Sequence, residues 1–454
     1  MDRYRLQTSP KALGYLLTRA IDARGWRRAE TARKLRELSE KRGHPLNTGR
    51  DGIWYWEHGR TPDRATQLLL AELFGIPLTA VDERPWPEWL SEDPAQRPAP
   101  RPWTSVGATQ ALATLQGGAM DTTRRKLVLI AGGTLTASLL AWITADPAAA
   151  GQLTHGNKIG ETAVARLEGR VRKLHRMDDL DGGGGIIDET SSALALVSGL
   201  LRNRSCTDAH RRRLYAAAAD LARQLAAALF DVEGEVADDA FDTALRCAHI
   251  AGDTALGANV LAFWSAAAYN TGRLHDAANM ASTGLTAVRS RATPRVEALL
   301  TSRRGRARAH LGDPACWSDF DRAQSLLAEA NGHQDPDWAY WFDEAELLAA
   351  RASSHHDMGQ PASAAHGFAQ AHALFDPECV RTRALYLTRQ ADAYFEHGEI
   401  ERACTTASDA LDLAESISSR RTTEPLLSLA GRLAAFDTLS TREFHDRAQN
   451  ALTA

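Results

Sequence analysis

The sequence predicts an all-α protein, and three observations support that prediction. Val, Ile, Tyr and Phe do not gather into alternating runs, which argues against a sheet. From about residue 155 onward the chain is rich in Ala and Leu, with Arg on the polar faces, and indicates one helix after another. Within residues 1–90, apolar residues recur at helical spacing in several short stretches.

Length and charge indicate more than one domain. The chain has 454 residues, of which 24% are charged and 44% hydrophobic, typical of a soluble globular protein. Its net charge of −4 conceals an asymmetry, because residues 1–90 carry 16 Lys and Arg against 12 Asp and Glu, whereas the remainder carries 37 against 45. A basic head on an acidic body predicts an anionic partner for the head. Five scattered cysteines without a CxxC pair, and a start without a secretory signal, predict a cytoplasmic protein.

The head, residues 1–90, is predicted to fold into four to five short helices. Each apolar stripe is followed by a glycine or a turn-forming stretch, which ends a helix. The predicted helices are Leu13–Arg24, Ala29–Leu38, Arg50–His58 and Arg64–Phe74, with a turn over Gly43–Thr48.

The order of these helices resembles the Cro/repressor-type helix-turn-helix, the XRE family. The resemblance is carried by AETARKL in the second helix, IWYWEHGRTPD at the end of the third and LLLAELFGIP in the fourth, over about 65 residues. In that family the stretch before Trp-Glu-x-Gly is the recognition helix, matched here by Ile53, Trp56, Glu57 and Gly59. One departure is the extra stretch Arg36–Asn47, which we expect either to lengthen the second helix or to form a basic loop beside DNA.

The resemblance implies a role for each residue of the recognition helix. Ile53 and Trp56 are expected to face the core of the head. The implied contacts to DNA bases come from Arg50, Asp51, Trp54 and Tyr55, and those to phosphates from Arg27, Arg28, Arg60 and Arg64. The alternatives are that Asp51 caps the helix, that Trp54 packs on the inserted stretch, and that the arginines form a solvated face.

Three segments separate the head from the rest of the chain. Pro94, Pro98, Pro100 and Pro102 predict an extended linker over 91–126. Residues 127–181 are predicted to form an apolar helix and a connecting helical segment. The charge-free stretch Leu127–Ile143 falls short of the about 20 residues of a membrane helix, so we expect it to be buried, with a membrane span as the alternative. Gly182–Gly185 is expected to be a flexible joint before the final domain, 186–454.

The final domain contains glycines at a loose period. Gly234, Gly272, Gly312, Gly359 and Gly398 are 38, 40, 47 and 39 residues apart, and three of them are followed five positions later by Ala277, Ala364 and Ala403. A glycine lets two helices turn back on each other, and small residues let them pack closely. This arrangement resembles the tetratricopeptide repeat (TPR), whose period is about 34 residues, so the sequence predicts an irregular TPR-like α-solenoid. The combination of head and repeats is similar to a group of actinobacterial regulators.

The sequence contains no phosphate-binding loop, HExxH, GxSxG or metal-ligand spacing, so neither an enzyme nor a cofactor is predicted. His355, His356 and Asp357 are expected to form a solvated helix end. The leading interpretation is a homodimeric, sequence-specific regulator of transcription that binds double-stranded DNA, while its repeats sense a peptide or protein effector. The alternative is an interaction adaptor, in which the head is degenerate, the repeats hold a protein partner and the apolar stretch attaches to a membrane.

Overall fold

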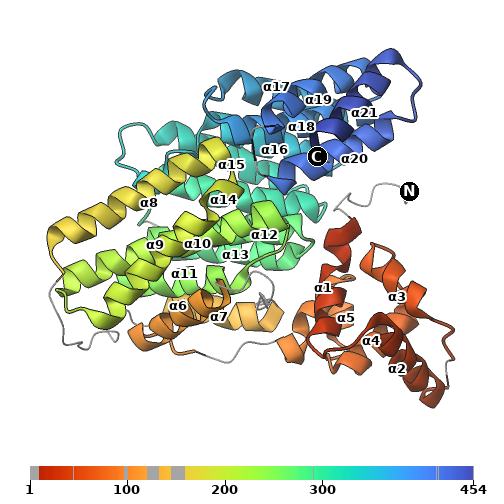
Figure 1. Ribbon diagram of the computed structural model, residues 1–454, viewed down its shortest axis with the longest axis horizontal. Helices are drawn as coiled ribbons and strands as arrows, with labels where there is room; N and C mark the ends of the chain where they lie inside the picture. The colour runs from red at the N-terminus through yellow and green to blue at the C-terminus, as the bar shows by residue number, and fades with distance from the viewer. Residues whose placement is uncertain are drawn as a thin grey trace.

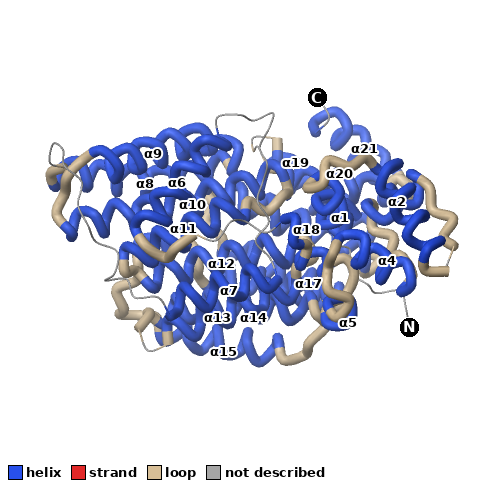
Figure 2. Tube along the Cα trace, turned by 90° about the horizontal axis from the view of Figure 1, so that it is seen from below, coloured by secondary structure: helices blue, strands red, loops and turns tan. Residues whose placement is uncertain are grey.

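The structure, a computed structural model, is helical throughout the part of the chain that it describes. The described residues are 10–43, 45–96, 101–119, 132–144, 159–289, 291–415, 417 and 419–452. Every regular element within those ranges is a helix, which confirms the predicted all-α fold class (Figure 2). A small head, drawn in red and orange, lies beside a larger helical body (Figure 1).

The head is a bundle of five helices followed by two short 3-10 turns. Its elements are α1 (Pro10–Asp22), α2 (Arg28–Lys41), α3 (Arg50–Glu57), α4 (Arg64–Phe74), α5 (Ala80–Glu83), η1 (Glu88–Glu92) and η2 (Pro94–Gln96). Leu17, Leu35, Ile53 and Leu70, one from each of the first four helices, are fully buried and form its core. Because α2 continues to Lys41, the first half of the extra stretch lengthens the second helix, and its remaining described residues belong to the connection to α3.

The packed head continues beyond residue 90. The Trp89 side chain is fully buried, and its Nε1 donates a hydrogen bond of 3.1 Å to the side chain of Gln67. Arg24 donates two hydrogen bonds, of 2.7 and 2.8 Å, to the carboxylate of Asp93 and one of 2.5 Å to the backbone oxygen of Phe74. A bidentate pair of this kind fixes η1 and η2 against α1 and α4.

The segment expected to be an extended linker is partly helical. Helix α6 (Ser105–Ala119) buries Ala108, Ala111, Leu112 and Leu115, which follow helical spacing. It packs on α9 (Gly183–Asn203) and α11 (Asp238–Ala251). No proline lies between Pro102 and the end of α6, so no missing N–H group interrupts the helix. Among the described residues of this segment, 101–104 lie outside any helix, and residues 97–100 and 120–126 lie outside the described ranges.

The apolar stretch at 127–143 contributes helix α7 (Gly132–Thr144), and its residues 127–131 lie outside the described ranges. Leu135, Leu139 and Trp142 are buried on one side of α7. A Cβ at Gly257 of α12 (Thr254–Asn270) would come within 2.5 Å of the Trp142 ring, so the ring lies directly on the backbone of α12. Among the described residues, no helix has the length and apolar character that a membrane crossing requires.

The body consists of two long helices followed by a series of antiparallel helix pairs. Before the pairs come α8 (Glu161–Asp181) and α9 (Gly183–Asn203). The pairs are α10 (Asp208–Glu233) with α11 (Asp238–Ala251), α12 (Thr254–Asn270) with α13 (Leu274–Val288), α14 (Pro294–His310) with α15 (Cys316–Glu329), α16 (Glu344–Asp357) with α17 (Pro361–Leu374), α18 (Val380–Glu396) with α19 (Ile400–Ala414), and α20 (Arg420–Leu433) with α21 (Leu439–Leu452).

The recurring glycines lie at the turns within these pairs, which confirms the predicted TPR-like fold of the final domain. Gly234, Gly272, Gly312, Gly359 and Gly398 all have positive φ, between 71° and 86°, a conformation that favours glycine. The alanines five positions later, Ala277, Ala364 and Ala403, are fully buried. The longest spacing, before Gly359, has a local cause, because the connection between α15 and α16 holds the extra turn η4 (Asp337–Ala339).

The four glycines at 182–185 do not form the flexible joint that the sequence predicts. Only Gly182 has positive φ, 78°, and it breaks the chain between α8 and α9, whereas Gly183–Gly185 form the first turn of α9. A Cβ at Gly183 would lie 2.8 Å from the backbone of Ala228 in α10. Glycine is required there for close helix packing, which offsets its low helix propensity.

The array of pairs curls until its last pair meets its first. Helices α10, α12, α14, α16, α18 and α20 contact one another in sequence, and α20 also contacts α10. The Arg420 guanidinium donates a hydrogen bond of 2.9 Å to the backbone oxygen of Glu233, and the Ser419 hydroxyl one of 3.0 Å to Asp231. We call these six helices the inner helices, and their contacts close the array into a ring.

Candidate nucleic-acid interface

Helix α3 has a buried side and an exposed side. Ile53 is fully buried and Trp56 is 7% exposed, so both face the core of the head as expected. On the other side, the Arg50 and Asp51 side chains are 74% and 81% exposed, and Trp54 and Tyr55 are 42% and 49% exposed. A short helix anchored by two apolar side chains thus presents two charged and two aromatic side chains to solvent.

The glutamate of the Trp-Glu-x-Gly motif fixes α3 to its neighbours. The Glu57 carboxylate is buried, accepts a hydrogen bond of 3.1 Å from the Thr18 hydroxyl of α1, and accepts another from Arg28 Nε of α2. Gly59, with φ of 95°, then turns the chain away from α3. The motif is explained by packing of the head, because one carboxylate joins three helices.

The two aromatic side chains of α3 pack on their own helix. The Trp54 ring stacks on His58, with centroids 4.0 Å apart, and meets Tyr55 edge-on at 5.2 Å. These contacts hold Trp54 at the surface, beside Tyr55, and differ from the alternative in which Trp54 packs on the inserted stretch. Flat aromatic faces of this kind suit contact with thymine methyl groups or sugars.

The four arginines expected at phosphates fall into two groups. Arg28 binds Glu57, and Arg64 donates to the backbone oxygen of Val81 at 2.6 Å and to Asp82. Arg28 and Arg64 therefore hold the head together, although 44% and 46% of their side chains remain exposed. Arg27 and Arg60 are exposed, and within the described part of the chain neither side chain has an ion-pair partner.

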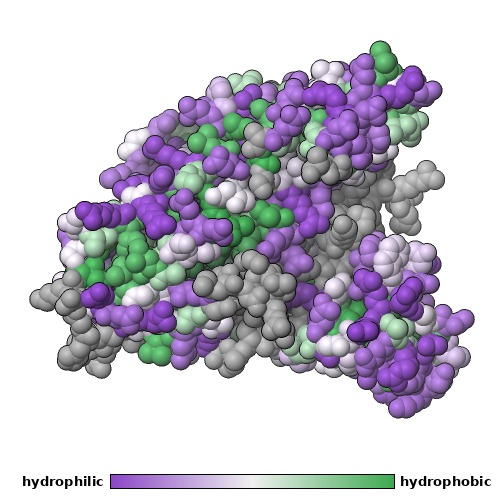
Figure 3. All heavy atoms as spheres, in the orientation of Figure 1, coloured by the Kyte–Doolittle hydropathy of each residue, from purple (hydrophilic) through white to green (hydrophobic). Residues whose placement is uncertain are grey.

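The head is joined to the body by an acid–base contact next to α5. Arg84 forms an ion pair of 3.0 Å with Asp276 of α13. The Glu88 carboxylate, which is almost fully buried, accepts hydrogen bonds from the backbone N–H of His275 at 2.7 Å and from its Nδ1 at 2.6 Å. This hydrogen bond to Glu88 raises the pKa of His275. On the visible face, the head itself is mostly hydrophilic (Figure 3).

The expected solvated helix end at 355–357 is not what the structure contains. His355 stacks on Trp317 with centroids 4.2 Å apart, His356 Nε2 lies 3.0 Å from the Glu396 carboxylate, and Asp357 binds Arg306. His356, Asp392 and Glu396 bring three possible metal-ligand atoms together. Arg432 already binds Asp392, so one of the three groups has a cationic partner within the protein.

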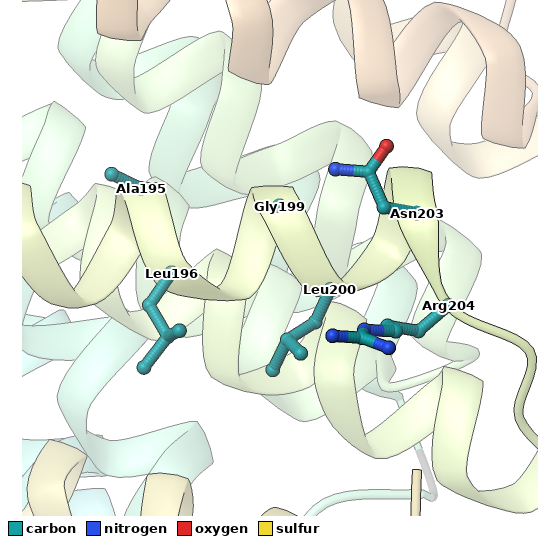
Figure 4. A pocket seen from close by; sticks show the side chains of 6 residues that line it. All are labelled: Ala195, Leu196, Gly199, Leu200, Asn203 and Arg204. Atoms are coloured by element: carbon teal, nitrogen blue, oxygen red, sulfur yellow. The ribbon is translucent and has the colours of Figure 1, made fainter. Parts of the chain in front are cut away.

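A hollow along α9 offers no comparable set of groups. Its lining is supplied by α9 and its C-cap residue alone, namely Ala195, Leu196, Gly199, Leu200, Asn203 and Arg204 (Figure 4). Leu196 and Leu200 point the same way from the helix, so the hollow is an apolar stripe with one cation at its end.

Sequence reasoning missed a group of arginines inside the body. Arg303, Arg306, Arg389 and Arg421 come from three inner helices and all lower the pKa of Tyr269, and the Arg306 guanidinium lies over the Tyr269 ring at 5.3 Å. No local signal marks them, since an arginine in an alanine-rich helix predicts a solvated face. Only the closure of the array brings these residues together.

Two comparisons with known proteins found matches, one to the head alone and one to most of the chain. A family model described as the SP15 N-terminal domain matches residues 17–80, from within α1 to the start of α5. No curated protein matches the chain. Among solved structures, a Signal Transduction ATPase with Numerous Domains (STAND) protein with a tetratricopeptide repeat sensor from Pyrococcus horikoshii is 12% identical, with a TM-score of 0.36 over 92% of this chain and 72% of that one.

Proposed function

We propose that this protein is a sequence-specific DNA-binding regulator of transcription, of the XRE helix-turn-helix type, with an effector-sensing TPR-like domain. The observation that carries the proposal is the two-sided character of α3. Ile53 and Trp56 anchor the helix from behind, and Arg50, Asp51, Trp54 and Tyr55 remain exposed for contact with base edges. A helix held this way fits the major groove of duplex DNA.

We assign recognition of the DNA base sequence to Arg50. It lies at the first position of α3, and its guanidinium can donate two hydrogen bonds to the two acceptors of a guanine. Such a pair contributes about 1–3 kcal/mol of discrimination between bases. Arg27 and Arg60 are assigned to phosphates, which position the head without reading sequence.

The regulator acts in this proposal as a cytoplasmic homodimer with two heads. An effector that favours one shape of the repeat array would change the spacing between the heads, and hence their fit to half-sites about 34 Å apart. The contact of Arg84 and Glu88 with α13 supports this link, because it joins the head directly to the second helix pair.

The test is selection of bound sequences from a random DNA pool by the intact protein, with Arg50→Ala beside it. We expect the unmodified chain to enrich one motif, and Arg50→Ala to lose preference at a guanine of that motif while keeping weak, salt-sensitive binding. Arg33→Ala, in an exposed ion pair on α2, is the matched control and should keep the motif. Absence of DNA binding at low salt, with a protein partner co-purifying, would favour the adaptor instead.

A further inference from the structure

The interior of the closed array contains four arginines beside two tyrosines. The arginine cluster consists of Arg303 and Arg306 of α14, Arg389 of α18 and Arg421 of α20. The Arg306 guanidinium lies over the Tyr269 ring at 5.3 Å, and the Arg389 guanidinium lies over the Tyr386 ring at 5.8 Å. Residues from four inner helices therefore converge on one place.

Three of these arginines have no close carboxylate partner, although Arg303 is buried and Arg389 and Arg421 are only partly exposed. Arg306 binds Asp357 directly, but Arg303 lies 4.0 Å from Glu346 and Arg421 lies 4.0 Å from Asp231. Arg389 donates to the Ser353 hydroxyl at 2.9 Å, and no described carboxylate lies within ion-pair distance of it. The Arg303 side chain is 9% exposed, and its buried Nε has no hydrogen-bond partner.

The surroundings show the excess of positive charge. Burial by itself raises the pKa of Tyr269, but Arg303, Arg306, Arg389 and Arg421 outweigh burial and lower it. Burial, together with Arg306 and Arg421, lowers the pKa of Arg389 from its ordinary value. A guanidinium does not give up its proton in a protein, so the excess charge persists inside the array.

Desolvated charge of this kind needs a counter-charge. A buried cation without a close partner is destabilising, and the planar fork of arginine matches the oxygens of a phosphoryl or carboxylate group. The exposed fraction of the side chain decreases from 27% at Arg421 to 9% at Arg303 and 3% at Arg306. Arg421 therefore lies at the outer edge of the cluster and Arg306 at its inner end.

We propose that the arginine cluster binds a small anionic ligand through its phosphoryl or carboxylate oxygens. Arg389 and Arg303 bind the oxygens, while Tyr269 and Tyr386 contact the ligand's apolar part. One part of this inference rests on the proposed function, namely that the ligand is the effector of the regulator. The binding itself is measured without DNA.

The experiment is isothermal titration calorimetry of the intact protein with two probes, inorganic pyrophosphate and citrate, at matched ionic strength set with potassium chloride. Each titration is repeated with Arg389→Gln, with Arg303→Gln and with the control Arg322→Gln, which removes an exposed arginine on the outer helix α15. We expect at least one probe to bind, with Kd at least tenfold weaker in Arg389→Gln and in Arg303→Gln and unchanged in Arg322→Gln.

Binding of pyrophosphate alone assigns the site to phosphoryl ligands, and binding of citrate alone assigns it to carboxylates. Failure of both probes to bind, or equal binding by all variants, would overturn the proposal. If Arg303→Gln does not fold, Arg389→Gln decides, because that side chain is partly exposed and is held by a neutral hydroxyl. Arg50→Ala should leave the affinity for the probes unchanged. Failure of the proposed DNA recognition can therefore be distinguished from failure of ligand binding.

Discussion

Replacement of Glu88 by alanine should release the head from the body. Helix α13 has no capping side chain of its own at Arg273, and the Glu88 carboxylate accepts from the N–H of its second residue. A helix cap contributes about 1 kcal/mol. The second hydrogen bond, to His275, contributes about 1 kcal/mol more, since the imidazole is 42% exposed and partly screened by solvent. The docking equilibrium should therefore shift by about 2 kcal/mol, or about 30-fold.

Hydrogen–deuterium exchange of the intact chain measures this shift. In Glu88→Ala, both partners of the contact should exchange faster, namely the first turn of α13 and the segment from α5 to η1. Glu83→Ala, which removes an exposed carboxylate of α5, is the control and should exchange as the unmodified protein does. Faster exchange confined to the first turn of α13, with the α5–η1 segment as protected as before, would refute the docking role of Glu88.

Three further predictions follow from named contacts. His275 has a raised pKa in the folded protein, so its contribution to docking is complete well below its ordinary pKa of 6.5 and is lost as the pH rises through the raised pKa. Small-angle X-ray scattering should therefore detect a more extended molecule on the alkaline side of that pKa than on its acid side, and His275→Gln should abolish this pH dependence. Glu57→Ala should lower the free energy of unfolding of the head by about 2 kcal/mol in urea, whereas Glu37→Ala, in an exposed pair, should change it by less than about 0.5 kcal/mol. Gly183→Ala should lower the melting temperature of the body, because the added Cβ clashes with α10 at a cost of about 1–3 kcal/mol. An unchanged melting temperature would contradict the packing role of Gly183. The control is Gly199→Ala, where the added Cβ meets open space, and it should be neutral or stabilising.

Features set by neighbouring residues were predictable from the sequence. The turns at Gly272 and Gly398 follow from a glycine between two apolar stripes, and the buried side of α3 follows from the spacing of Ile53 and Trp56. Helix α6 is also encoded locally, by the helical spacing of its apolar residues, but the prolines before it predict an extended conformation for the whole segment.

Features that depend on distant residues were not predictable. Gly183 marks close packing instead of flexibility because α10, far along the chain, presses on it. The arginine cluster joins residues from 303 to 421, and each of them alone has the pattern of a solvent-facing cation. Which face of a repeat points inward is fixed by how the whole array curls, and the periodicity of one helix carries no information about that curvature.

The contact between α20 and α10 changes how the body should come apart. An open row of repeats loses its end units one after another, because each unit touches only its neighbours. Here the final pair is held at both of its sides, by α18 and by α10. Fraying from the carboxyl end is thereby suppressed, and the six pairs are expected to melt in a single cooperative transition.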